Sequence, residues 1–125
     1  GHSTITIQKR TFVPGEILRI KCDRPGTVVK VRFLPHDKGN EAGNPYGLLP
    51  GNYTVPKNGI VEVLITRTYE KIAWISVHSG PEAWGQPLGW NNPYTRMTDV
   101  VVGTKEAPGK TSSSIEKQKL LEEAV

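Results

Sequence analysis

The stretch from Ser79 to Tyr94, SGPEAWGQPLGWNNPY, gathers the side chains of this chain that are best suited to recognition chemistry. Glycine and proline interrupt it every few residues, so the pattern predicts a long loop rather than a helix or a strand. Large aromatic side chains can bury enough area to order such a loop. Sugars present flat patches of C–H groups between hydroxyls, and proteins bind them with an aromatic face flanked by amide and charged groups. The residues that we expect to form a site of this kind are Trp84, Trp90, Asn91, Asn92 and Tyr94, helped by Tyr46 and Arg96.

Two other interpretations of the same loop stay open. Trp84 and Trp90 could fold back onto the domain as a small satellite core, because exposing tryptophan is costly and a loop of this length needs an anchor. The same two rings could instead form the centre of a protein-binding surface, where tryptophan is enriched. The satellite core predicts packed indoles, whereas the other two interpretations predict indoles that are free to meet a ligand or a partner.

A second loop, from Pro35 to Pro56, carries oxygen-bearing side chains at short spacing among its glycines. If the protein binds calcium, which prefers oxygen ligands, we expect Asp37 and Glu41 to hold it together with Asn91 and Asn92 of the first loop. Their spacing does not match the calcium loop of helix–loop–helix proteins, and aspartate and asparagine are also common turn residues. We expect no other cofactor.

The residue types that do catalysis are not arranged in a recognisable set, so we expect a protein that is not an enzyme. Cys22 is the single cysteine and lies in the run EILRIKC, where strand alternation predicts a small buried residue rather than a nucleophile. Ser79 follows His78 directly, yet adjacent residues of a strand point to opposite faces. The sequence also contains neither a cysteine–histidine cluster for a metal nor a glycine-rich phosphate loop of standard spacing.

The formal net charge of +4 comes from basic residues spread along several runs. This is typical of a solvated sheet face, although an anionic partner such as an acidic polysaccharide is an alternative. Nucleic-acid binding is not expected, because few basic residues besides Arg96 lie near the aromatic loop. No apolar run approaches the roughly 20 residues of a membrane-spanning helix, so no membrane span is expected.

Alternation of apolar and polar residues predicts the strands that must position these loops. Pro-Gly and Asn-Gly pairs between the runs predict tight turns. The two strongest runs, GIVEVLIT and KIAWISVHS, are separated by RTYE and predict a β-hairpin. The predicted strands are residues 3–9, 16–22, 27–34, 59–66, 71–79 and 98–103, with a short edge strand at 52–55.

The run at 71–79 also predicts which side chains face the core. Strand alternation divides it into two sets, of which the purely apolar one is expected to point inward. The inward set is Ala73, Ile75 and Val77, and the outward set is Ile72, Trp74, Ser76 and His78.

The two ends of the chain are expected to lie outside the core domain. Gly1-His2-Ser3 resembles the remnant of a cleaved affinity tag, so residues 1–3 are set apart from a domain at 4–104. Residues 105–125 begin as a polar linker, and Ser113 stands three residues before Glu116, which is the spacing of a capping box. The composition that follows predicts a short helix or tail, through which a protein partner could bind.

The order of these elements predicts an all-β fold, an antiparallel β-sandwich of jelly-roll type. With the loop SGPEAWGQPLGWNNPY and the hairpin GIVEVLITRTYEKIAWISV, this layout is similar to that of non-catalytic carbohydrate-binding modules and small bacterial jelly-roll lectins. The resemblance implies a lectin-like domain that binds a polysaccharide outside the cell or at its surface. The alternative is a structural or adhesion module of a phage particle, a secretion apparatus or a surface appendage, in which the same loop would bind a protein.

Overall fold

The structure is a computed structural model that describes residues 2–35 and 47–104. These residues form strands and turns without a helix, and the strands pair in antiparallel sheets, which confirms the all-β prediction. The strands are β1 (His2–Phe12), β2 (Glu16–Cys22), β3 (Val28–Pro35), β4 (Tyr53–Thr54), β5 (Ile60–Leu64), β6 (Tyr69–His78), β7 (Glu82–Ala83), β8 (Gln86–Pro87) and β9 (Met97–Thr104). The predicted C-terminal helix and the predicted site residues Asp37, Glu41 and Tyr46 lie outside the described residues.

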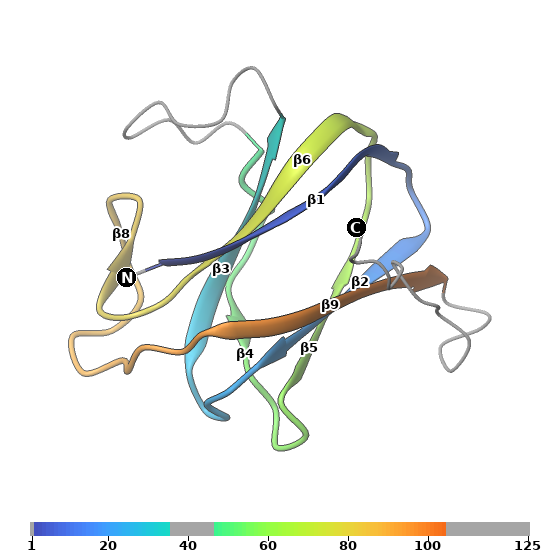
Figure 1. Ribbon diagram of the computed structural model, residues 1–125. Coiled ribbons are helices and arrows are strands. Elements are labelled where there is room, and N and C mark those ends of the chain that lie inside the picture. Colours follow the sequence, from blue (N-terminus) through green and yellow to red (C-terminus); the bar gives the residue numbers. More distant parts are fainter. Residues whose placement is uncertain (1, 36–46, 105–125) are drawn as a thin grey trace.

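Two sheets share one core (Figure 1). The strands β1, β6, β3 and β4 pair in that order in a four-stranded sheet, and β5, β2 and β9 form a three-stranded sheet. The rings of Phe12 and Phe33 stack with centroids 4.6 Å apart, and Tyr69 meets Phe33 edge-on at 5.0 Å. Burying a side chain of this size contributes roughly 1.5–3 kcal/mol. Both sheets supply further members of the core, which include Leu18, Ile20, Val29, Val31, Val61, Val63, Ile75, Val77 and Val100.

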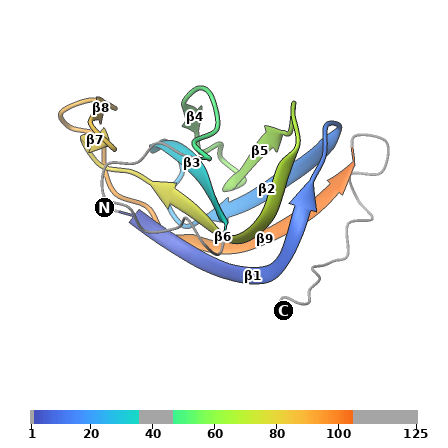
Figure 2. The ribbon, with the colours of Figure 1, turned by 90° about the horizontal axis from the view of Figure 1, so that it is seen from above.

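The predicted hairpin between residues 59–66 and 71–79 is wrong. Both runs are strands, but β5 pairs with β2 whereas β6 lies between β1 and β3, so they belong to different sheets. The link between them begins at Ile65, and β6 begins at Tyr69; both side chains are buried in the shared core. The chain between β5 and β6 therefore crosses from one sheet to the other (Figure 2). Alternation within a strand predicts its faces but not its partner.

A bulge in β6 changes part of the predicted face assignment. Ile75 and Val77 face the core, as predicted. Pairing with β3 slips by one residue between Trp74 and Ile72, so Ala73 bulges out of register. Ile72 consequently turns into the core, where it is buried, instead of sharing the outward face with Trp74.

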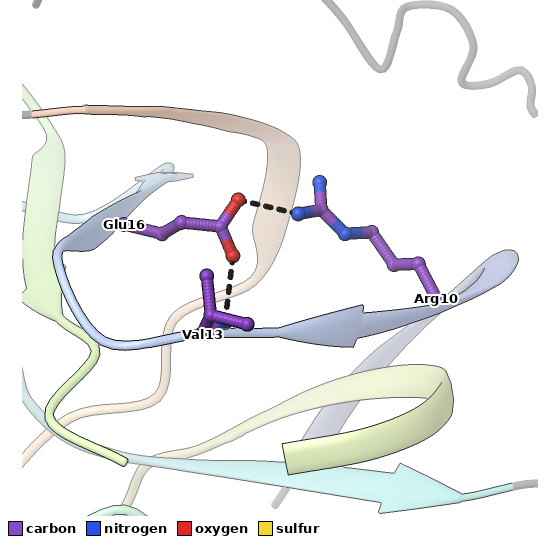
Figure 3. Close-up of polar contacts among 3 residues, drawn as sticks. All are labelled: Arg10, Val13 and Glu16. Carbon is purple, nitrogen blue, oxygen red and sulfur yellow. Dashed lines mark hydrogen bonds and ion pairs between the residues drawn. The ribbon is translucent and has the colours of Figure 1, made fainter. Parts of the chain in front are cut away.

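The turn from β1 to β2 is held by one carboxylate (Figure 3). Glu16, the first residue of β2, accepts a hydrogen bond from the Val13 N–H over 2.9 Å and forms an ion pair with Arg10 of β1. The Arg10 guanidinium also lies 4.4 Å from the centroid of the Phe12 ring. The ion pair is partly exposed, so we expect it to contribute about 1 kcal/mol or less. Together these contacts fix the path of the chain from the first sheet into the second.

The outer face of the four-stranded sheet is not solvated where β3 crosses it, contrary to the expectation for its basic residues. Lys30 and Arg32 are only 7% and 5% exposed. The Lys30 Nζ donates to the Gly51 carbonyl oxygen over 3.0 Å, and the Arg32 guanidinium lies 5.4 Å from the centroid of the Trp84 ring. The segment around β4 and the β7–β8 hairpin therefore cover this face.

The N-terminal boundary of the strands lies inside the expected tag remnant. β1 begins at His2, which pairs with His78 of β6, and the Ser3 hydroxyl accepts a hydrogen bond from the Met97 N–H over 3.2 Å. These two residues therefore contribute to the first strand and to its contact with β9. Among residues 2–35 and 47–104 there is no apolar helix of membrane-spanning length.

Candidate functional site

The aromatic loop contains a small hairpin, so the expectation that it has no strand is wrong. β7 pairs antiparallel with β8, and Trp84 and Gly85 form the turn between them with positive φ angles of 48° and 83°. Two successive residues with positive φ are typical of the tight turn that suits a two-residue hairpin. The Glu82 carboxylate accepts a hydrogen bond from the Gly85 N–H over 3.1 Å and closes the turn. The hairpin is too short to be seen in the residue pattern.

Trp84 packs against the four-stranded sheet, which is the arrangement of the satellite-core interpretation. The centroid of its ring lies 5.4 Å from the Arg32 guanidinium and 4.7 Å from the His78 ring. A guanidinium is attracted to the negative face of an indole, by about 0.5–2 kcal/mol. Burial lowers the pKa of His78, and the positive N-terminus and His2 lower it further. Trp84 thus anchors the β7–β8 hairpin to the imidazole of His78 and the guanidinium of Arg32.

Asn92, near the end of the loop, fixes it to β3. Its Oδ1 accepts a hydrogen bond from the Val28 N–H over 2.9 Å, and its Nδ2 donates to the Val28 carbonyl oxygen over 2.9 Å. The same Nδ2 donates to the Gly80 carbonyl oxygen over 2.7 Å. The side chain is buried, so these bonds are shielded from water. Asn92, predicted as a ligand-binding residue, instead has its donors and acceptor occupied by the backbone.

A second network ties the end of the loop to the turn after β2. The Asp23 Oδ1 accepts hydrogen bonds from the Thr95 hydroxyl and the Arg96 N–H, each over 2.9 Å. Thr95 also accepts from the Arg24 N–H over 3.0 Å, and its own N–H donates to the Ser79 hydroxyl oxygen over 2.9 Å. The Arg96 N–H and then the Thr95 hydroxyl lower the pKa of Asp23. Asp23 and Arg24 are about 70 residues from Thr95 and Arg96 in the chain, so no local signal could have revealed these bonds.

On either side of the Asn92 anchor the loop presents aromatic faces to solvent. Trp90 is 88% exposed and Tyr94 is 58% exposed. The Tyr94 ring lies directly against Gly80, where a Cβ atom would overlap it, so that contact sets the orientation of the ring. Asn91 and Arg96 are exposed as well. The predicted site is thereby divided, with Trp90, Asn91, Tyr94 and Arg96 at the surface and Trp84 and Asn92 holding the loop.

The calcium expectation finds no support in the described part of the chain. Asp37 and Glu41 lie outside it, and the amide oxygen of Asn92 is occupied by the Val28 N–H. Residues 2–35 and 47–104 contain no group of three or more histidine, cysteine, aspartate or glutamate side chains that could hold a metal ion. Asn91 alone supplies one amide oxygen, which is too few for a calcium site.

Cys22 belongs to the core, as its position in the alternating run predicts. Burial, helped by the negative charge of Asp23, raises the pKa of its thiol to about 11. The thiolate is the reactive form of cysteine, so this thiol is a poor nucleophile at neutral pH.

Sequence reasoning missed a groove between the open edges of the two sheets. It has a volume of about 510 Å³ and lies between β4 and β5, lined in part by Asn52, Tyr53, Asn58 and Glu62. The Tyr53 hydroxyl donates to the Pro50 carbonyl oxygen over 2.9 Å, and burial raises its pKa. The two rims belong to different sheets, so the groove depends on tertiary packing and leaves no mark in the residue pattern.

The described site thus offers an exposed tryptophan and tyrosine with an amide and a guanidinium nearby, on a loop held by buried hydrogen bonds. Such a surface can stack on a flat apolar face and donate hydrogen bonds beside it. Comparisons with models of protein families, with curated proteins and with solved structures found no match to this chain.

Proposed function

We propose that this protein is a non-catalytic glycan-binding module whose recognition surface is the exposed part of the aromatic loop. The observation that carries the proposal is the Trp90 indole, which is 88% exposed on a loop fixed by buried hydrogen bonds. A large apolar ring gains free energy when it leaves water. A loop that holds such a ring outward is best explained by a ligand that covers it.

The way in which the loop is anchored supports recognition by a preformed surface. Asn92 and Thr95 fix the backbone on either side of Tyr94, so little conformational entropy remains to be lost when a ligand binds. Trp90 and Tyr94 supply two ring faces, and Asn91 and Arg96 supply hydrogen-bond donors. The guanidinium of Arg96 also favours acidic sugars over neutral ones.

A glycan suits this surface better than a protein partner does. Among the described residues, the large apolar side chains that are exposed are Val13, Leu64, Trp90 and Tyr94, and only the last two belong to the loop. A protein-binding hot spot is normally surrounded by contacts that exclude water. A sugar ring needs only one or two aromatic faces with polar groups beside them. The structural or adhesion module of a particle or appendage is the alternative, in which Trp90 would insert into a partner.

The proposal includes a finer architecture and a location. We propose that the two sheets form a β-sandwich of jelly-roll type, which is supported by the core that both sheets share. We also propose that the module acts outside the cell or at its surface, where polysaccharides are abundant. The location follows from the functional proposal and is tested with it.

Binding of soluble polysaccharides, measured by isothermal titration calorimetry, tests the function. The panel should contain neutral chains such as xylan and acidic chains such as alginate and polygalacturonate. We expect saturable binding to one class, weakened about 10–100-fold in Trp90→Ala because a buried aromatic anchor is worth about 1.4–2.7 kcal/mol. Trp90→Phe, which keeps a flat ring, should retain part of the affinity.

The matched control is Val13→Ala, which truncates an exposed apolar residue on the β1–β2 turn. It should leave the affinity unchanged, while circular dichroism confirms that every variant is folded. No heat of binding with any class of polysaccharide would reject the glycan proposal and favour the protein-partner alternative. Equal affinities for wild type and Trp90→Ala would show that glycan binding occurs elsewhere on the surface.

A further inference from the structure

β5 is an edge strand whose outer side is open in the described part of the chain. β2 pairs with it on one side in a regular register, without a bulge. On its other side lies the groove of about 510 Å³ that separates it from β4. Natural proteins commonly block such an edge with a proline, a lysine or a bulge. The strand reads IVEVL and has no proline, lysine or bulge, and its one charged side chain, Glu62, is paired with Arg19 of β2.

The hydrogen-bond pattern shows which backbone groups of this edge are unused. The Ile65 N–H donates to the Glu16 carbonyl oxygen of β2 over 2.9 Å. Hydrogen-bonded and non-bonded pairs alternate along an antiparallel ladder, so Val63 is again directed at β2. Glu62 and Leu64 fall at the alternate positions. Their N–H and C=O groups point away from β2, toward the open side.

The side chains along the edge leave a short segment ready to pair. Leu64 is 54% exposed, although it is a large apolar residue. The Glu62 carboxylate is 2.9 Å from the Arg19 Nε of β2, so its charge is balanced within the chain. The Ile60 N–H is already occupied by the Asn58 side chain, over 2.9 Å. Within the described part of the chain, the backbone groups of the edge that lack a hydrogen-bond partner are therefore centred on Glu62 to Leu64.

We propose that β5 pairs antiparallel with β5 of a second copy of this chain, so that the two three-stranded sheets join across a two-fold axis. In the register that we infer, Val63 lies at the axis and Glu62 of each copy faces Leu64 of the other. The two outward-facing pairs exchange about four hydrogen bonds. A two-fold axis uses the same patch on both copies, which is the commonest form of homodimer.

Charge favours the register in which Glu62 faces Leu64 of the second copy over a register in which Glu62 faces Glu62. Pairing Glu62 with Leu64 keeps the two carboxylates from facing each other directly, which would be destabilising. Each carboxylate also keeps its own Arg19. The aliphatic stem of Glu62 covers the exposed Leu64 of the partner copy. The β7–β8 hairpin lies in another part of the molecule (Figures 1 and 2), so pairing along β5 leaves both aromatic loops free, whatever they bind.

Sedimentation velocity of the purified protein tests the pairing, from about 10 μM to about 1 mM, because a small interface predicts weak association. The wild type should shift from monomer to dimer across this range. Leu64→Glu places like charges opposite each other in both symmetric pairs, so it should weaken the dimer about 3–30-fold. Leu64→Lys gives each Glu62 an opposite charge and should keep or strengthen the dimer.

Two further measurements distinguish pairing along β5 from association through another surface. Trp90→Ala removes the most exposed aromatic residue outside β5 and should leave the dimer unchanged. Hydrogen exchange at Glu62 and Leu64 should slow as the protein concentration rises, because their N–H groups become bonded. The proposal is overturned by a wild type that is monomeric throughout, by equal effects of the glutamate and lysine variants, or by a dimer that Trp90→Ala abolishes.

Discussion

Replacement of Asn92 by alanine should destabilise the fold and loosen the aromatic loop. The side chain makes hydrogen bonds of 2.9, 2.9 and 2.7 Å to the Val28 N–H, the Val28 carbonyl oxygen and the Gly80 carbonyl oxygen. Each contributes about 0.5–1.5 kcal/mol net, and the variant also leaves their buried partners unsatisfied. We therefore expect the free energy of unfolding to fall by about 2–4 kcal/mol.

Urea unfolding followed by tryptophan fluorescence measures this loss. With a denaturant dependence of about 2 kcal/mol per molar for a domain of this size, the midpoint should fall by about 1–2 M. Asn91→Ala is the matched control, because Asn91 is the exposed neighbour. It should change the free energy of unfolding by less than about 0.5 kcal/mol. Equal losses in the two variants would refute the claim that Asn92 holds the loop.

Asn92→Asp tests the same contact through pH. Aspartate keeps an acceptor for the Val28 N–H but places a carboxylate against the carbonyl oxygens of Val28 and Gly80. Its pKa in the folded state should therefore rise above the usual value of about 3.9. When the pKa of a carboxyl group is higher in the folded state than in the unfolded state, the contribution of that group to stability is greatest below its unfolded-state pKa. That contribution is lost as the pH rises through its folded-state pKa. Relative to Asn91→Asp, the destabilisation should grow from about pH 4 to about pH 7.

Three further predictions concern single contacts. Gly80→Ala should lower the free energy of unfolding by about 2 kcal/mol or more, because the added Cβ would overlap the Tyr94 ring and φ is 91°. Gly85→Ala, with φ of 83° and open space around it, should lose only about 1 kcal/mol in the same urea experiment, and equal losses would contradict the clash. Hydrogen bonds lower the pKa of Asp23 from its ordinary 3.8, so its stabilisation is present above that value and is lost as the pH falls through the lowered one. The melting temperature of the wild type should therefore drop more steeply below about pH 4 than that of Asp23→Asn, and parallel curves would argue against the contact. Since the pKa of Cys22 is raised to about 11, its thiol should react with a disulfide reagent far more slowly in the native protein than in urea, whereas equal rates would place it at the surface.

Much of the fold could be predicted because strand alternation is a local property. The predicted run at 16–22 matches β2, and the others coincide with strands to within a few residues. Pairing could not be predicted in the same way. The hairpin between residues 59–66 and 71–79 failed because Ile65 and Tyr69 are buried as the chain passes between sheets, and Ile72 changed face because of the bulge at Ala73.

The aromatic loop could be recognised in the sequence, but which of its side chains are exposed and which anchor it could not. Trp84 and Trp90 stand in the same kind of glycine-rich and proline-rich context, yet one packs against Arg32 and the other is almost fully exposed. Asn92 carries an amide of the kind that binds ligands. Only its hydrogen bonds to Val28, 64 residues earlier in the chain, show that it anchors the loop. Which side chain faces solvent is decided by contacts between distant segments.

The most direct test of glycan recognition is the indole N–H signal of Trp90 in a two-dimensional ¹⁵N–¹H spectrum, titrated with oligosaccharides from neutral and acidic polysaccharides. The three tryptophans give three such signals, and the signal that disappears in Trp90→Phe is that of Trp90. We expect a saturable shift of the Trp90 signal with one class of glycan, while the signal of Trp74 on β6 stays in place. A Trp90 signal that no glycan moves, or a shift confined to Trp74, would contradict glycan recognition by the aromatic loop.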